Sequence, residues 1–160
     1  MKTWWERLAS FDSVFLRFAL GLSFLSAVAD RFGWWGAFGQ PNIAWGNFAR
    51  FVEYTAKLNW FLPHELIPAL AVLATCAEVL FGLLLLAGWQ TRLTALSSGI
   101  LLMTFALSMT LALGIKAPLN FSVFSAAGGS LLLATCPAFP FSMDDLLRRR
   151  EAGPVRTESH

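Results

Sequence analysis

Long apolar runs alternate with short polar segments along the chain, and four of the runs are long enough, or nearly so, to cross a membrane as helices. A bilayer core of roughly 30 Å needs about 20 apolar residues in a helix. The pattern therefore predicts an all-α fold, a bundle of four transmembrane helices. The predicted spans are residues 14–30, 65–88, 92–114 and 118–138.

Composition supports this interpretation. Of the 160 residues, 56% are hydrophobic and 14% are charged, whereas soluble domains have about a quarter charged residues. The length allows one domain, which we assign to residues 1–147, followed by a polar and disordered tail at 148–160. The net charge is +2 without a basic stripe interleaved with aromatic residues, so nucleic-acid binding is not expected.

The first span also has features of a secretory signal peptide, because Ala27-Val28-Ala29 resembles a cleavage site. Arg17 inside the apolar run opposes cleavage and favours a retained helix. With four spans, eight Lys and Arg residues fall on the side of the termini and four on the other side. Positive charge is retained in the cytoplasm, so we expect both termini to be cytoplasmic, in the inner membrane of a bacterium.

The segment between the first two spans, residues 31–64, is rich in tryptophan. Around residues 45–57 the apolar side chains recur at helical spacing, which predicts an amphipathic helix along the membrane surface. An interfacial anchor is the simpler interpretation, and a lid over an outward-facing pocket is the alternative. Such a pocket would suit a quinone or a lipid-like molecule. Its candidate lining residues are Trp34, Trp35, Trp45, Trp60, Lys116 and Asn120.

Glu78 is the carboxylate in the middle of the second span. It shares a helix face with Ala74, Thr75 and Gly82, so it is expected to face other helices rather than lipid. A charged acidic residue at a helix centre costs about 2.5 to 3.5 kcal/mol on insertion scales, and Glu78 must therefore be paired, protonated or beside water. We expect a direct or water-bridged pair with Arg17; the alternative is that Arg17 extends to the inner interface.

Other polar and small residues define further expectations. Ala19, Ser23 and Ala27 recur at spacings of four, which is typical of a face that packs on another helix. Arg92 opens the third span and is the third intramembrane polar candidate. No spaced set of metal ligands and no nucleotide or hydrolase motif is present, so no metal site is expected and the catalytic residues stay undetermined.

Three stretches of the chain resemble the DoxX family of small four-helix membrane proteins. They are LRFALGLSFLSAVADRF, AEVLFGLLLLAGWQTRLTAL and PFSMDDLL, and PLNFSVFSAAGG is similar to one bacterial branch. The tryptophan-rich stretch 33–63 departs from the resemblance, since it is longer than in the shortest members. The positions that match the pattern are Arg17, Gly21, Arg31, Glu78, Gly82, Gly88 and Arg92.

The resemblance implies several functions without selecting one. Some relatives are membrane subunits of systems that oxidise thiosulfate and reduce quinone, and others accompany enzymes that handle superoxide or thiols. Our first hypothesis is accordingly a quinone-side or docking subunit of an oxidoreductase, not catalytic alone. The alternatives are a carrier of a small solute or protons that uses Glu78, and a structural scaffold. The expected partners are the lipid bilayer, an oxidoreductase subunit and a second copy of the chain.

Overall fold

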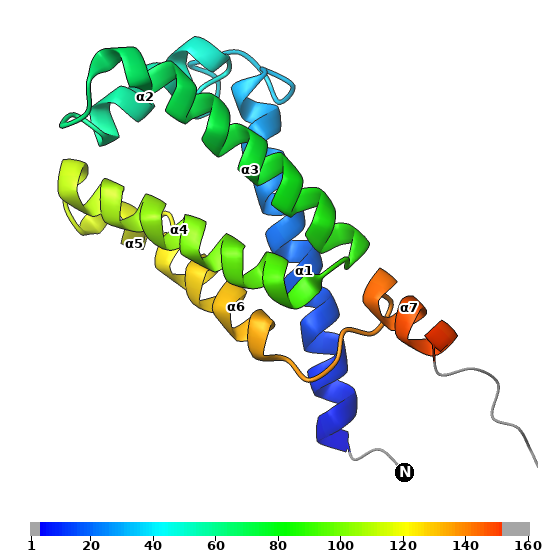
Figure 1. Cartoon of the computed structure of the whole chain (residues 1–160). Coiled ribbons are helices and arrows are strands. Elements are labelled where there is room, and N and C mark those ends of the chain that lie inside the picture. Colours follow the sequence, from blue (N-terminus) through cyan, green and yellow to red (C-terminus); the bar gives the residue numbers. More distant parts are fainter. Residues whose placement is uncertain (1–3, 152–160) are drawn as a thin grey trace, which may run out of the picture.

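The computed structural model describes the backbone of residues 4–151 and the side chains of residues 11–151, and this part of the chain is all-helical. Figure 1 shows the helices in their spatial arrangement. Their bounds are α1 Trp4–Arg31, α2 Phe48–Leu58, a short 3-10 helix His64–Leu66, α3 Ile67–Ala87, α4 Thr91–Leu113, α5 Lys116–Asn120, α6 Val123–Thr135 and α7 Met143–Glu151.

Three helical segments of the described part are long and apolar enough to cross a membrane: Phe11–Arg31, His64–Ala87 and Thr91–Leu113. They confirm the first three predicted spans to within a few residues. Most of their surface is not buried inside the protein, and large apolar side chains such as Leu73 and Leu111 are exposed on it. Such exposure over whole helices is expected where lipid rather than water is the solvent.

The prediction of one continuous helix over 118–138 is wrong. The chain forms α5, turns at Phe121 and Ser122, and continues as the 13-residue helix α6. Ser122 adopts a left-handed conformation with a φ of 55°, which a helix cannot contain. Hydropathy does not reveal this break, because both sides of it are apolar.

The described helices pack as two pairs. α1 lies along α3, and α4 lies along α6. Figure 1 shows that α3 and α4 meet at the turn 88–90 and diverge toward the end that carries α2. A hydrophobic core joins the pairs near the turn; its buried members are Leu20, Phe24, Leu85, Ala95, Leu133 and Phe139.

Small residues allow both pairs to approach closely. At Gly82 of α3, an added Cβ would lie 2.9 Å from Leu25 Cδ2 and 3.2 Å from the Gly21 carbonyl oxygen of α1. Between α4 and α6, Ser130 Oγ donates a hydrogen bond of 2.9 Å to the Ala95 carbonyl. The two pairs are therefore held by backbone-close contacts as well as by the core.

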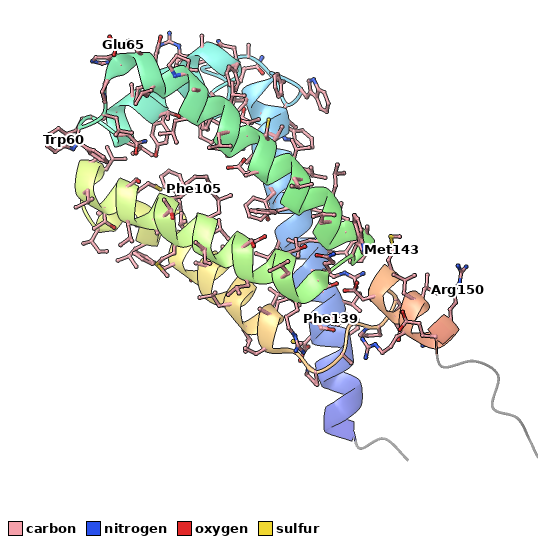
Figure 2. All side chains as sticks on the ribbon, viewed as in Figure 1. Trp60, Glu65, Phe105, Phe139, Met143 and Arg150 are labelled. Atoms are coloured by element: carbon pink, nitrogen blue, oxygen red, sulfur yellow. The ribbon has the colours of Figure 1, made fainter. Side chains whose placement is uncertain are left out.

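The two ends of the molecule carry different structures. Figure 2 shows Trp60 and Glu65 at the end with α2, and Met143 and Arg150 at the end with α7. The predicted disordered tail was wrong for Arg148 to Glu151, which complete α7; the rest of that tail, 152–160, lies outside the described residues. We call these the α2 end and the α7 end.

Candidate functional site

Glu78 lies on the buried face of α3, as predicted. Thr75, Glu78 and Gly82 are all buried on this face, and Glu78 is only 2% exposed. The spacing of three and four residues brings them to one side of the helix, which faces α1. Glu78 is thus removed from lipid and must be compensated within the protein.

The partner of Glu78 is Arg31, the last residue of α1. Arg31 Nη2 donates a hydrogen bond of 2.7 Å to Glu78 Oε1 and lies 2.7 Å from Oε2, and both side chains are 3% exposed. Arg31 Nη1 donates to Thr75 Oγ1 at 2.9 Å, while that hydroxyl donates to the Ala71 carbonyl at 2.8 Å. One guanidinium therefore binds the carboxylate and the hydroxyl one turn away.

The predicted pair of Arg17 and Glu78 is wrong. The two helices run in opposite directions, so residues later in α1 than Gly21 lie beside residues earlier in α3 than Gly82. Arg31 was assigned to the loop because it follows the apolar run, but its long side chain reaches Glu78 from the helix end. Arg31 matches a position of the family pattern, and this match could have identified it as the partner of Glu78.

Aromatic residues of the α2 end cover this pair. The Arg31 Cζ lies 3.7 Å from the ring centroid of Phe51 in α2 and 5.2 Å from that of Trp45, distances at which a cation is attracted to the ring face. Trp45 meets Phe51 edge-on at 5.2 Å. The guanidinium is consequently enclosed between α3 and these rings.

α2 itself is well defined in sequence. Asn47 caps its first turn by accepting a hydrogen bond of 3.0 Å from the Arg50 N–H. Its buried side chains are Phe51, Thr55 and Leu58, and Phe48 and Val52 are half-buried. Burial in α2 raises the pKa of the Tyr54 phenol above its ordinary value.

Asp30 connects the same site to the loop before α2. Its Oδ2 accepts hydrogen bonds from the backbone N–H groups of Ala44 at 2.9 Å and Trp45 at 3.3 Å. Asp30 and Arg31 are adjacent, so the end of α1 binds the loop through one residue and α3 through the next. We call Asp30, Arg31, Thr75, Glu78 and Phe51 the α2-end cluster.

Arg17 lies at the other end of the α1–α3 contact. It is 1% exposed, and its Nη2 donates to the Phe141 carbonyl at 2.8 Å, while Nη1 lies 3.4 Å from the Pro140 carbonyl. Gly88 packs against it, because an added Cβ there would lie 2.8 Å from Arg17 Nη1. Gly88 also has a φ of 67° as it ends α3. Arg17 thus binds the segment before α7.

The remaining predicted site residues are dispersed. Arg92 is exposed and donates a hydrogen bond of 3.1 Å to the Cys136 carbonyl. Trp45 covers Arg31 as described above, and Trp35 donates to the Ser26 carbonyl at 3.1 Å. The exposed members of the predicted pocket lining are Trp34, Trp35, Trp60, Lys116 and Asn120.

The chemistry that this arrangement offers is charge compensation and rigid attachment. Arg31, Thr75 and Glu78 are buried, and Glu78 has two contacts of 2.7 Å to one cation. Among residues 11–151, no group of three or more His, Cys, Asp or Glu side chains is placed to hold a metal ion. The residues of the cluster instead tie α1, α2 and α3 together.

Comparison with known proteins gives one match. The model of the family described as DoxX matches residues 13–112, a stretch that contains both buried arginines and Glu78. No curated protein and no solved structure matches the chain.

Proposed function

The chain belongs to the DoxX family, and on that premise we propose that this integral membrane protein is a docking subunit that holds an oxidoreductase at the membrane through its α2 end. The observation that carries the proposal is that the α2 end combines exposed tryptophans with the buried α2-end cluster. At the α2 end, Trp34 is 80% exposed and Trp60 is 72% exposed, while Arg31, which lies under Phe51 and Trp45, and its partner Glu78 are almost fully buried.

Rigid support suits a docking surface. An interface gains affinity when its residues are already held in their bound positions, because less conformational entropy is lost on binding. Here the loop before α2 is bound by Asp30 and α2 is packed on Arg31. Exposed tryptophans are also the residue type that most often contributes binding energy at protein interfaces.

The enclosed cluster supports this function over the carrier hypothesis. A carrier would need Glu78 to meet the transported solute or proton during the cycle. Glu78 is instead held by Arg31, whose guanidinium is covered by Phe51. Opening that path would separate a desolvated ion pair, which is costly. We therefore propose a structural role for Glu78.

The proposal includes a membrane topology. We infer that α5 and α6 together make a fourth crossing: the 13 residues of α6 span about 20 Å, and α5 with the turn at 121–122 covers the rest of the roughly 30 Å hydrocarbon core. Both termini then lie on the cytoplasmic side of a bacterial inner membrane, and α2 lies along the opposite surface. Protease protection of tags at the two ends tests this topology: four crossings predict equal protection, and three predict opposite protection.

The proposed function also involves a quinone as electron acceptor. We propose that it binds at the α2 end, where Trp35 and Trp60 offer apolar ring surfaces, and that it accepts electrons from the docked enzyme. A second copy of the chain is a further proposed partner, because the exposed apolar helix faces would accommodate it as readily as lipid.

Purification in mild detergent from native membranes tests the function. We expect a quinone-linked oxidoreductase among the co-purified proteins and a quinone in the lipid extract, both measured by mass spectrometry. The double variant Trp34→Ala/Trp60→Ala should reduce the recovered enzyme about tenfold. Trp89→Ala is the matched control, since Trp89 is also exposed, at 48%, but lies at the turn between α3 and α4. Absence of an oxidoreductase, or equal loss in the control, would refute the proposal.

A further inference from the structure

An open groove of about 490 Å³ lies on the surface of α1 near its Asp30 end. It is separate from the α2-end cluster except that both share Asp30. The lining residues used in the argument below are Leu22, Ser23, Ser26, Asp30, Trp35 and Asn42.

This groove occupies a face of α1 that we expected to pack on another helix. Ser23 is exposed, so the predicted packing role is wrong for this residue. α1 contacts α3 through its other side, where Gly21 and Phe24 are buried. Ser23 and Ser26 therefore present hydroxyl groups to the bilayer, and neither hydroxyl has a hydrogen-bond partner within the part of the chain that the structure describes.

Asp30 supplies the charge of the groove. It is 7% exposed, and its Oδ2 binds the backbone N–H groups of Ala44 and Trp45. Its Oδ1 is buried and has no hydrogen-bond partner among the described residues. An unsatisfied buried carboxylate oxygen is costly, and the groove has no cationic residue in its lining. A positively charged hydrogen-bond donor in the groove would compensate the charge of this carboxylate.

The order of these groups along α1 matches the order of groups along a phospholipid. From Asp30, Ser26 lies about 6 Å, Ser23 about 10 Å and Leu22 about 12 Å further into the span, at 1.5 Å per residue. A phospholipid with an amine headgroup presents an ammonium outermost, then phosphate and ester oxygens, then an acyl chain. Serine hydroxyls can donate to such oxygens.

We propose that this groove binds a phospholipid with a primary ammonium headgroup. The ammonium pairs with the Asp30 carboxylate, the hydroxyls of Ser26 and Ser23 donate to the phosphate and ester oxygens, and the acyl chain follows Leu22. The ring of Trp35 and the amide of Asn42 border the headgroup. This binding does not depend on the docking function proposed above.

The proposal predicts headgroup selectivity. The trimethylated nitrogen of phosphatidylcholine is charged but cannot donate a hydrogen bond, and phosphatidylglycerol has no cation. Native mass spectrometry of the detergent-solubilised protein, titrated with these lipids and with phosphatidylethanolamine of the same acyl chains, measures the preference. We expect phosphatidylethanolamine to bind about tenfold more tightly than phosphatidylcholine, a ratio that corresponds to about 1.4 kcal/mol.

A water-soluble headgroup distinguishes the source of the amine. Glycerophosphoethanolamine has the ammonium and the phosphate but no acyl chains. We expect it to compete weakly, because it forgoes the contact with Leu22. If it binds as tightly as phosphatidylethanolamine, the groove is a site for a soluble amine and the lipid proposal is overturned.

Three variants localise the effect. Asp30→Asn keeps an oxygen for Ala44 and Trp45 but removes the charge, and should lower the preference to about twofold or less. Ser26→Leu fills the groove from an exposed position and should lower binding of phosphatidylethanolamine about fivefold even if Asp30→Asn fails to fold. Ser125→Leu, at an exposed position of α6, is the matched control and should change neither. Equal binding of the two lipids by the native chain, unchanged preference in Asp30→Asn, or unchanged binding in Ser26→Leu would overturn the proposal.

Discussion

The charges of the two buried arginines of α1 are compensated by different kinds of group. Arg31 places its charge against the carboxylate of Glu78, whereas Arg17 places its charge against the backbone carbonyls of Pro140 and Phe141. Both side chains are at most 3% exposed. Removing Arg31 would leave a buried anion without its cation, while removing Arg17 would leave neutral carbonyls. Loss of Arg31 should therefore destabilise the protein more than loss of Arg17.

Each arginine also joins parts of the chain that are distant in sequence. Arg31 connects α1 to α3 and α2. Arg17 connects α1 to the segment before α7, next to Gly88 at the end of α3. The close approach at Gly21 and Gly82 lies between them. The α1–α3 pair is consequently fixed at both ends by a charge and in the middle by backbone contact.

The largest expected change in the free energy of unfolding comes from removing the cation that pairs with Glu78. Arg31→Met should lower the free energy of unfolding by about 3 to 5 kcal/mol, because it leaves the Glu78 carboxylate buried and unpaired. An equilibrium titration with SDS in mixed micelles of a mild detergent, followed by circular dichroism, measures this change.

The double variant Arg31→Met/Glu78→Met is the control for charge. Replacing both members of a buried pair with apolar residues is often neutral or stabilising, so the double variant should recover most of the loss seen in Arg31→Met. If the double variant is as unstable as the single one, the contribution of Arg31 comes from packing against Phe51 rather than from its charge.

A smaller loss is expected at the other arginine. Arg17→Met removes hydrogen bonds from a charged donor to carbonyl groups, and such bonds contribute about 1.5 to 3 kcal/mol. The carbonyl groups left behind are neutral, which limits the cost compared with an unpaired carboxylate. The same SDS titration measures it, with Arg17→Lys retaining the charge as the control. If Arg17→Met lowers the free energy of unfolding more than Arg31→Met does, an unpaired buried carboxylate is not the costlier defect, which contradicts the prediction.

The α7 end also depends on Asp144. Its carboxylate accepts hydrogen bonds from the backbone N–H groups of Gln90 at 2.8 Å and Thr91 at 2.7 Å, which begin α4. Asp144→Ala should lower the free energy of unfolding by about 1 kcal/mol, the usual loss for a helix N-terminal cap. Asp144→Asn retains one acceptor oxygen and should lose less, in the same titration. Equal losses would exclude hydrogen bonding as the cause.

The sequence predicted the helices better than their connections. The first three spans were predicted to within a few residues, because an apolar run of about 20 residues has few alternatives. The break at Ser122 was missed, since a single left-handed residue changes the path of the backbone without changing hydropathy. Ser23 was misplaced for a related reason: spacing identifies a face of a helix but does not say whether another helix or lipid covers it.

Of the buried ion pair, the sequence predicted the position of Glu78 but not that of Arg31. The burial of Glu78 followed from helical spacing and from the cost of exposing a carboxylate to lipid. Its cation was missed because Arg31 follows the apolar run and was therefore assigned to the loop. Only the crossing of α1 and α3 brings Arg31 to Glu78, and that crossing depends on tertiary packing at Gly21 and Gly82.

The smallest expected effect comes from a pair with the same charges as the α2-end cluster but without its burial. Arg50 and Glu53 of α2 form an ion pair of 3.1 Å, with side chains 50% and 66% exposed. Solvent screens such a pair, so Glu53→Gln should change the free energy of unfolding by less than about 0.5 kcal/mol, and salt should remove the difference. The SDS titration in low and high salt measures both. A loss comparable to that of Arg31→Met would show that arginine–glutamate pairs stabilise this protein regardless of burial, which would remove the physical basis for distinguishing its buried charges from its exposed ones.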